Sequence, residues 1–371
     1  MRNKLTGLFA ALAMTFTGVG VSVVTTTEAQ AQSYRGGDRG YRHYREDRRR
    51  YKNPRRHYGH RGYRGYRDPR GYRAYRGYRD PRASRHYRAE RARGYYGRSE
   101  SPEEREARRR HAGKSSGETY AATLRQLVPD CSVDIAEPAD EGATASRPAD
   151  LKRYDAVFLS GSPLHVYQDT PAVRRQLEFM RTVFASGAPS FGSCAGLQVA
   201  VAAAGGSVRS MPQRMEAGLS RRITRTAEGQ DHPLLSGRAP TWDAPAVHTD
   251  EVEQLPEGAT LLAGNDVTRV QAAEIRHDRG IFWGVQYHPE LSLREIAIAL
   301  RRQASSLIEA GLADHEDDVE GRAALLDRLH QKPEARSLRW LLGVNGEFAD
   351  EIGRRRELTN FIAALPSLDR R

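Results

Sequence analysis

The second half of the chain is predicted to fold as an α/β domain built on a parallel β-sheet. From about Gly117 onward, short apolar runs alternate with stretches of helical periodicity, which is typical of strands joined through helices. The run Tyr154–Leu159 is almost entirely apolar and ends in Ser160–Pro163. A buried parallel strand that leads into a turn has this pattern.

The individual elements follow from local patterns. Leu124, Leu127 and Val128 share one side of a helix over Glu118–Val128. A proline is well placed to start the helix expected over Pro171–Ser186. The other expected elements are strands at Cys131–Ile135, Ala188–Gly192, Ser220–Thr226, Ala246–Val252, Ala259–Ala263, Gln271–Ile275 and Ile281–Gln286, and helices over Ala195–Ala204 and Ser292–Ala310.

Charge divides the chain near residue 115. Residues 31–114 hold 28 Lys and Arg against 10 Asp and Glu, a net charge of +18, whereas residues 115–371 hold 29 against 36. The whole-chain net charge of +12 therefore describes neither part. The chain has two cysteines, Cys131 and Cys194, so a disulfide framework is excluded.

The N-terminus has the pattern of an export signal. Arg2 and Lys4 precede an apolar stretch over Leu5–Val24, and Ala29-Gln30-Ala31 supplies small residues at the spacing that a signal peptidase needs. We expect residues 1–31 to be a cleaved signal peptide and the protein to be exported, to the periplasm or outside the cell. An uncleaved membrane anchor is the alternative.

Residues 32–114 form a low-complexity segment rich in Arg, Tyr and Gly. It contains 13 of the 17 tyrosines and almost no aliphatic residues, so we expect disorder, with a short helix over Glu103–Arg110. Arg supplies charge and Tyr supplies stacking faces, which suit nucleic acid, another anionic polymer or a membrane surface. A solvated linker without a specific partner is the alternative.

The strongest motif surrounds Cys194. Phe191–Gln198 contains Gly-x-Cys-x-Gly between an expected strand and an expected helix. Glycines on both sides allow a sharp turn that holds a nucleophile at a helix N-terminus, where the helix dipole and unpaired amides favour a thiolate. An inert core cysteine beside two turn glycines is the alternative.

A second motif, Gly284–Glu290, closes the apolar strand at Ile281–Val285 and contains His288 and Glu290. Two residues apart in extended chain, both side chains point the same way. One can then act as a base while the other orients it, with Cys as the nucleophile.

Gly192–Gln198 and Gly284–Glu290 together resemble the class I glutamine amidotransferase domain. Further similar stretches are Leu159–Pro163, Val247–Val252 and Pro256–Ala259. The resemblance covers about residues 117–305. It implies a flavodoxin-like, three-layer α/β domain with a mostly parallel sheet over residues 115–305, preceded by the disordered tail and followed by a helical extension, 306–371.

The resemblance also implies residue roles. Cys194 would attack the side-chain amide of glutamine, His288 would move the proton and Glu290 would hold His288. The backbone amides of Ser162 and Ala195 would form the oxyanion hole. The residues implied to bind substrate are Gly161, Gln198 and His248. The half-reaction needs neither a metal nor another cofactor.

Two features depart from the family pattern. Ser162 stands where many members have glycine. The family also opens with an apolar strand before its first helix, yet the residues directly before Gly117 are the charged Arg105–Lys114. Loss of a central strand exposes two sheet edges, so either another segment replaces it or the domain is damaged.

Three functions fit the sequence. The first is glutamine hydrolysis with ammonia passed to a synthetase or other acceptor in trans, since residues 306–371 are too short for an ATP-dependent synthetase domain and no phosphate-binding Gly-x-x-x-x-Gly-Lys-Ser/Thr loop occurs. The second is γ-glutamyl hydrolysis, and the third is an inactive, exported Arg/Tyr-rich binding protein. A cytoplasmic location, usual for the resembled family, is the alternative to export.

Overall fold

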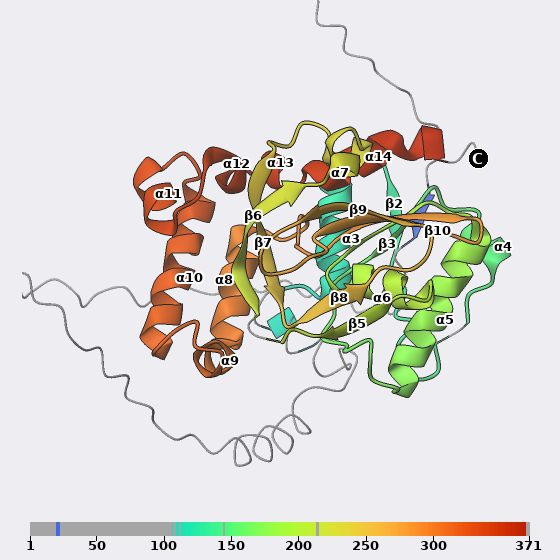
Figure 1. Ribbon diagram of the computed structural model, residues 1–371, viewed down its shortest axis with the longest axis horizontal. Coiled ribbons are helices and arrows are strands. Elements are labelled where there is room, and N and C mark those ends of the chain that lie inside the picture. Colours follow the sequence, from blue (N-terminus) through green and yellow to red (C-terminus); the bar gives the residue numbers. More distant parts are fainter. Residues whose placement is uncertain are drawn as a thin grey trace, which may run out of the picture. The chain divides into compact units, whose positions relative to one another are not determined.

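A computed structural model of the chain describes residues 20–22, 106, 109–110, 113–143, 145–212 and 215–368 (Figure 1). The predicted signal peptide (1–31) and Arg/Tyr-rich segment (32–114) lie almost entirely outside these residues, as does most of the helix expected over Glu103–Arg110.

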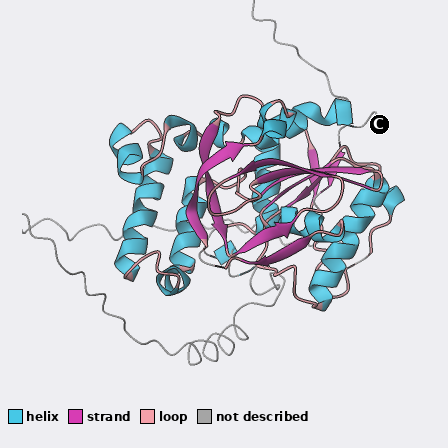
Figure 2. Cartoon of the chain, viewed as in Figure 1, coloured by secondary structure: helices cyan, strands magenta, loops and turns pink. Residues whose placement is uncertain are grey.

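Strands and helices alternate through the first part of the domain, and helices alone make up its C-terminal part (Figure 2). The strands are β1 (Gly20–Ser22), β2 (Ser132–Asp134), β3 (Val157–Leu159), β4 (Ser190–Ser193), β5 (Ser207–Ser210), β6 (Glu216–Arg225), β7 (Thr241–His248), β8 (Asp250–Gln254), β9 (Ala259–Gly264), β10 (Ala272–His277) and β11 (Gly280–Val285). The helices are α3 (Ser116–Leu127), α4 (Pro148–Leu151), α5 (Pro171–Ser186), α6 (Ala195–Ala203), α7 (Ala227–Gln230), the 3₁₀ helix η1 (Pro233–Leu235), α8 (Leu293–Arg302), α9 (Ala304–Glu309), α10 (Glu316–Gln331), α11 (Arg336–Leu342), α12 (Gly346–Ala349), α13 (Glu351–Arg354) and α14 (Arg356–Leu368).

One large sheet organises the domain, with strand order β2-β1-β3-β4-β11-β10-β9-β6-β7. The strands from β2 to β11 in this order are parallel, and those from β11 to β7 are antiparallel. Strands β5 and β8 form a separate antiparallel pair. The parallel core brings the carboxyl ends of β3, β4 and β11 to one edge of the sheet.

Helices cover both faces of the parallel strands, which confirms the three-layer α/β class. On one face, α3 and α14 pack against the sheet through a core that includes Tyr120, Phe158 and Phe361. On the other, α5 and α6 pack through Phe184, Leu197 and others. Successive residues of β3 enter opposite cores, as alternation along a strand requires.

The missing first strand is replaced. Gly20–Ser22, from the apolar N-terminal stretch, forms β1 and lies between β2 and β3. It pairs in parallel with β2, Gly20 opposite Ser132 and Ser22 opposite Asp134, and Ser22 also lies opposite Val157 of β3. Of the two outcomes considered from sequence, the structure therefore has a substitute strand.

Two predicted elements are divided. The strand expected over Ala246–Val252 is split at Thr249 into β7, which belongs to the large sheet, and β8, which pairs with β5. The helix expected over Ser292–Ala310 is two helices, because the chain leaves helical geometry at Gln303 (ψ 15°) between α8 and α9. The pattern of apolar residues indicated neither break.

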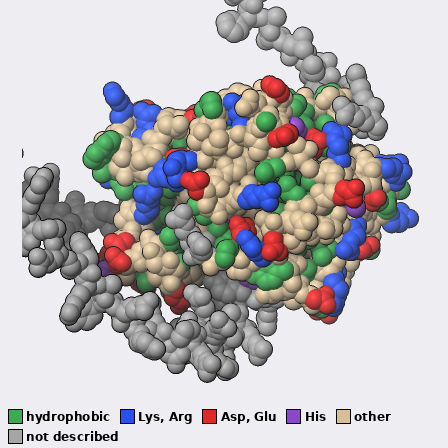
Figure 3. Space-filling model, in the orientation of Figure 1, with side chains coloured by type: hydrophobic (Ala, Val, Ile, Leu, Met, Phe, Trp, Pro, Cys, Tyr) green, Lys and Arg blue, Asp and Glu red, His purple; other side chains and the backbone are tan. Residues whose placement is uncertain are grey.

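The C-terminal helices are part of the folded domain. Helices α8, α10 and α11 share a core with β6 and gather at the end of the domain away from α5 (Figure 1). No helix among the described residues is long and apolar enough to cross a membrane. On the face shown in Figure 3, acidic and basic side chains are interspersed.

A buried ion pair fastens α14 to the domain. Nε and Nη2 of Arg238 donate to the two carboxylate oxygens of Glu357 at 2.6 and 2.7 Å, and Nη1 donates to Glu347 at 2.7 Å. The side chains of Arg238 and Glu357 are 2% and 0% exposed. Tyr287, which precedes His288, donates a 2.8 Å hydrogen bond to Glu357. The C-terminal helix is thus connected to the segment that carries His288.

Deletion of residues 1–31 tests the substitute strand. The deletion removes β1 and with it the backbone pairs to β2 and β3, so we expect the free energy of unfolding to fall by about 3 kcal/mol. Urea unfolding followed by circular dichroism measures the change. Deletion of residues 61–82 serves as the control, because it shortens the basic segment and leaves β1. Equal stability of the 1–31 deletion and the full chain would show that β1 contributes nothing.

Replacement of Glu357 tests the buried ion pair. Glu357→Ala leaves Arg238 buried with half of its charge partners, so the free energy of unfolding should fall by about 3 kcal/mol. The matched control is Asp266→Ala, which breaks the exposed Arg222–Asp266 pair and should change stability by about 0.5 kcal/mol or less. Similar losses in both variants would contradict a special role for Glu357.

Candidate active site

Cys194, the predicted nucleophile, occupies a strained turn between β4 and α6. Its φ is 53° and its ψ is −113°, and such a backbone costs a residue with a side chain about 1–3 kcal/mol. The Cys194 amide donates a 2.8 Å hydrogen bond to the Val285 carbonyl, which ties the turn to β11. Gly196 makes the turn feasible, because a Cβ there would collide with the Leu159 carbonyl. Cys194 thereby becomes the N-cap of α6.

His288 and Glu290 lie in the segment that follows β11. Nδ1 of His288 is 2.7 Å from Oε1 of Glu290, and both side chains are buried. The His288 amide donates a 2.8 Å hydrogen bond to the Pro245 carbonyl, which fixes the segment against β7. The contact forms in a turn rather than in the extended chain that the sequence analysis assumed, since β11 ends at Val285 and the Leu291 amide donates to the His288 carbonyl at 3.4 Å.

The charge state of His288 depends on its neighbours. Burial acts to lower the pKa of His288, but the negative charges of Glu290 and Cys194, together with hydrogen bonds to both side chains, outweigh burial and raise the pKa to about 10. The ring therefore keeps its proton at neutral pH. Glu290 occupies one side of this imidazolium and the sulfur of Cys194 another.

Gly161, in the turn after β3, places Cys194 and His288 side by side. A Cβ on Gly161 would lie 2.7 Å from Cε1 of His288 and 3.6 Å from Cβ of Cys194. The first distance is far below van der Waals contact, so only glycine leaves room for the imidazole. The sequence prediction placed Gly161 at the site, and the geometry gives a steric reason for the residue type.

The two predicted oxyanion-hole residues directly follow residues of this cluster. Ser162 follows Gly161, and its hydroxyl accepts a 3.1 Å hydrogen bond from the Leu164 amide, which supports the turn. Ala195 follows Cys194 as the first residue of α6, where helix amides have no partner within the helix. Two backbone amides are thus placed on the chain next to the Cys194–His288 pair.

Two residues behind Glu290 had not been predicted as site residues. Ser193 donates a 3.0 Å hydrogen bond to Oε1 of Glu290, and Tyr120 of α3 donates a 3.0 Å hydrogen bond to Ser193. Ser193 was visible only as part of the cysteine motif. Tyr120 lies on a helix far away in sequence, and a tyrosine on the apolar face of a helix is ordinarily a core residue.

Gln198 and His248, predicted to bind substrate, are engaged within the protein. Nε2 of Gln198 donates to the Asp250 carbonyl at 3.0 Å and to Oε1 of Gln286 at 3.3 Å. The His248 ring contacts the same Asp250 carbonyl through Nδ1 at 3.0 Å and Glu216 through Nε2 at 2.9 Å. Both side chains thus hold Asp250 in place, and direct contact with substrate stays a prediction for them.

The Asp250 carboxylate anchors a second polar cluster that the sequence prediction missed. His165 lies 2.6 Å from it through Nδ1, and the Tyr167 hydroxyl lies 3.4 Å from it. Partial burial and the Asp250 charge raise the pKa of Tyr167 to about 12. The signal in the sequence was the acidic residue two positions after His248, close to a turn already assigned to the site.

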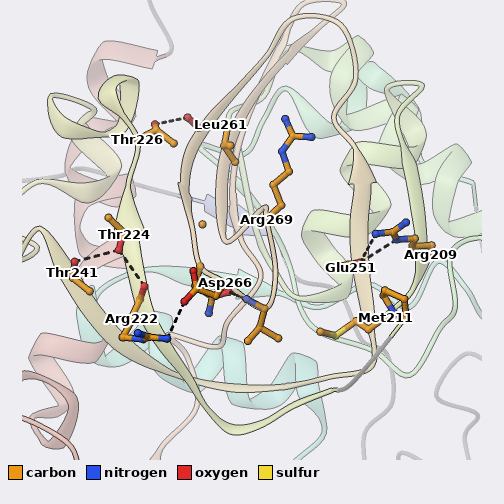
Figure 4. Close-up of a pocket in the computed structure, with 14 residues that line it drawn as sticks. Arg209, Met211, Arg222, Thr224, Thr226, Thr241, Glu251, Leu261, Asp266 and Arg269 are labelled. Carbon is orange, nitrogen blue, oxygen red and sulfur yellow. Dashed lines mark hydrogen bonds and ion pairs between the residues drawn. The ribbon is translucent and has the colours of Figure 1, made fainter.

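A broad cleft of about 1220 Å³ opens elsewhere, along β6, β8 and β9 (Figure 4). Two ion pairs cross its lining, Arg209 with Glu251 and Arg222 with Asp266. None of Cys194, His288 and Glu290 lines it. The cleft is therefore a different site from the Cys194–His288–Glu290 cluster.

A cysteine at a strand-to-helix turn, beside a His–Glu pair that follows the neighbouring parallel strand, is an arrangement typical of cysteine-dependent acyl-transfer enzymes. The family model described as glutamine amidotransferase class-I matches residues 112–303. The chain belongs to the class I glutamine amidotransferase family.

The similar proteins include a γ-glutamyl amide hydrolase and GMP synthases. A γ-glutamyl-L-1-hydroxyisopropylamide hydrolase from a Pseudomonas species is 39% identical over 220 residues, covering 58% of this chain and 73% of that one. One subunit of the glutamine-hydrolysing GMP synthase from Sulfurisphaera tokodaii is 31% identical over 156 residues, covering 42% and 78%. A GMP synthase from Porphyromonas gingivalis is 36% identical over 144 residues, covering 39% of this chain and 26% of that enzyme.

Solved structures with a similar fold include a glutamine amidotransferase from Thermotoga maritima. It has 18% sequence identity and a TM-score of 0.46, and the match covers 66% of this chain and 91% of that one.

Gly161→Ala tests the packing around His288. The added Cβ displaces the imidazole from Cys194, so alkylation of Cys194 by iodoacetamide at neutral pH should slow by about 10²-fold. Mass spectrometry of the Cys194 peptide measures the rate. Gly321→Ala in α10 is the control, because a Cβ there meets nothing within 4 Å. An unchanged rate in Gly161→Ala would mean that His288 does not activate the thiol.

Proposed function

We propose that the chain hydrolyses the amide bond of γ-glutamyl compounds, with glutamine as the simplest substrate, through a thioester on Cys194. One observation carries the proposal: Cys194 and His288 lie side by side beneath Gly161, and Glu290 is 2.7 Å from His288. Nucleophile, proton carrier and orienting carboxylate thus occur in one buried cluster.

In the first step, the Cys194 sulfur forms a bond to the amide carbon of the substrate. Because His288 keeps its proton at neutral pH, the sulfur reacts as a thiolate paired with the imidazolium. His288 then passes this proton to the leaving nitrogen as the carbon–nitrogen bond breaks. Ammonia or an amine leaves, and the γ-glutamyl group remains on sulfur.

The charge that develops on the substrate oxygen needs donors at that moment. We assign this role to the backbone amides of Ser162 and Ala195, which flank the Cys194–His288 pair. Preorganised donors of this kind contribute about 3 kcal/mol each to transition-state stabilisation. A serine at position 162 supplies its amide as glycine would, because the backbone N–H is common to both.

In the second step, water attacks the thioester carbon while neutral His288 accepts its proton. The carbon–sulfur bond breaks, glutamate leaves and the thiolate–imidazolium pair is restored. The reaction consumes one water and yields glutamate plus ammonia or amine. The similarity to a separate subunit of GMP synthase supports a role in which ammonia passes to a synthetase acceptor in trans.

Hydrolysis of a γ-glutamyl alkylamide is the second candidate function. It is supported by the 39% identity to the Pseudomonas γ-glutamyl-L-1-hydroxyisopropylamide hydrolase, of which the match covers 73%. The two reactions share every step above and differ in the group on the leaving nitrogen. Space for that group beside Cys194 would favour the alkylamide.

A comparison of substrates with cysteine variants tests the proposal. We expect the full chain to release ammonia from glutamine or amine from γ-glutamyl isopropylamide, and Cys194→Ala to lose at least about 10³-fold in kcat. Coupled glutamate detection follows both reactions with one assay. Cys131→Ala is the matched control, since Cys131 is also a free, buried cysteine, and it should keep the activity.

The ratio of kcat/KM for the two substrates separates the two functions. A higher value for glutamine supports an amidotransferase, and a higher value for the alkylamide supports the hydrolase. A folded wild-type chain without glutamate release from either compound would refute both.

A further inference from the structure

We propose that Ser193, backed by Tyr120, is a positioning residue that holds Glu290 in the orientation and charge state in which it grips His288. The inference rests on the proposed function, in which His288 moves the proton. Neither residue touches the reacting atoms, so both act through Glu290.

The hydrogen bonds in this chain of side chains have one direction. A carboxylate can only accept, so Ser193 donates its proton to Oε1 of Glu290 at 3.0 Å. The serine oxygen is then free to accept, and the Tyr120 phenol donates to it at 3.0 Å. The sequence of donors is Tyr120 to Ser193 to Glu290, and each bond polarises the next.

Burial strengthens these hydrogen bonds. Tyr120, Ser193 and Glu290 are 1%, 0% and 3% exposed, so water does not compete for their polar atoms. Burial first, and then the Glu290 charge, raise the pKa of Tyr120 well above its usual value. The phenol therefore stays protonated and remains a donor at neutral pH.

Oε1 of Glu290 carries both functional contacts. It accepts from Ser193 and lies 2.7 Å from Nδ1 of His288, whereas Oε2 is buried without a hydrogen-bond partner among the described residues. Rotation of the carboxylate would thus replace the oxygen that makes two hydrogen-bond contacts by the oxygen that makes none. The Ser193 hydroxyl fixes which oxygen faces the imidazole.

Helix α3 adds two further hydroxyls to the same segment. Thr123 donates to the backbone carbonyl of Glu290 at 3.2 Å, and Thr119 donates to the Glu295 carboxylate at 3.0 Å. Two hydroxyls of α3 thus reach residues after β11 directly, and Tyr120 reaches Glu290 through Ser193. Ser193 completes the arrangement from β4, one residue before the nucleophile.

The donor also limits the negative charge that Glu290 presents to His288. The titratable groups that act on this pair are Cys194 at the start of α6 and Tyr120 of α3. Without the Ser193 hydroxyl, Oε1 of Glu290 no longer shares its negative charge with a second donor, so it attracts the imidazolium more strongly. The pH at which His288 loses its proton then rises, and activity persists to higher pH even as kcat falls.

Single and double variants test this inference. In Ser193→Ala, the alkaline limb of the kcat/KM profile should move up by about 0.5–1 pH unit, and kcat should fall about 10-fold. Tyr120→Phe should give a smaller shift in the same direction. Because Tyr120 acts only through Ser193, the double variant should match Ser193→Ala rather than the sum of the single changes.

The matched control is Ser190→Ala. Ser190 is buried in the same strand and donates to the Ile281 carbonyl, so its loss removes a buried hydroxyl without touching Glu290. It should leave both pH limbs in place. Additive shifts in the double variant would overturn the inference. So would an alkaline limb that stays in place in Ser193→Ala and also in Tyr120→Phe.

The pH dependence of Cys194 alkylation by iodoacetamide provides a second readout that needs no substrate. Because the imidazolium beside the sulfur is held more strongly in Ser193→Ala, the pH profile of alkylation should move to lower pH in that variant. If the wild-type chain hydrolyses neither substrate, the proposed function fails, and alkylation alone decides the role of Ser193. If the wild type is active but the alkylation profile is unchanged in both Ser193→Ala and Tyr120→Phe, the inference is refuted while the proposed function stands.

Discussion

The site depends on the parallel pairing of β4 with β11. Ser193 lies opposite Val285, and the next amide, that of Cys194, donates to the Val285 carbonyl at 2.8 Å. The carboxyl ends of parallel strands meet at one edge of a sheet, so this register brings the cysteine turn beside the segment of His288. A shift by one residue would turn the side chains of β11 to the opposite face of the sheet.

The parallel core and the Cys194–His288–Glu290 cluster could be predicted because each has a local signature. Strands buried on both faces have continuous apolar sequences, and the turn at Cys194 requires small neighbours. His288 and Glu290 are two residues apart in one motif, so their contact is also local, although it forms in the turn after β11 and not in an extended strand. These features depend on residues close together in sequence, which is why pattern and resemblance were sufficient.

The remaining features depend on contacts between distant segments. Ser193 meets Glu290 only through the β4–β11 register, and Tyr120 meets Ser193 only once α3 packs on the sheet. A hydroxyl has no periodic signature that indicates its partner. The division at Thr249 arises likewise from the pairing of β8 with β5, a tertiary contact that the sequence over Ala246–Val252 does not indicate.

The order of synthesis gives β1 an unusual history. Gly20–Ser22 leaves the ribosome well before β2 and β3, the two strands with which it pairs. During that interval β1 has no sheet to join, so the parallel core is completed only after β2 and β3 have been made. A chain without β1 would keep open edges on β2 and β3, and open edges pair readily with other chains. Whether residues 20–22 remain on the chain therefore decides whether the parallel core has open edges.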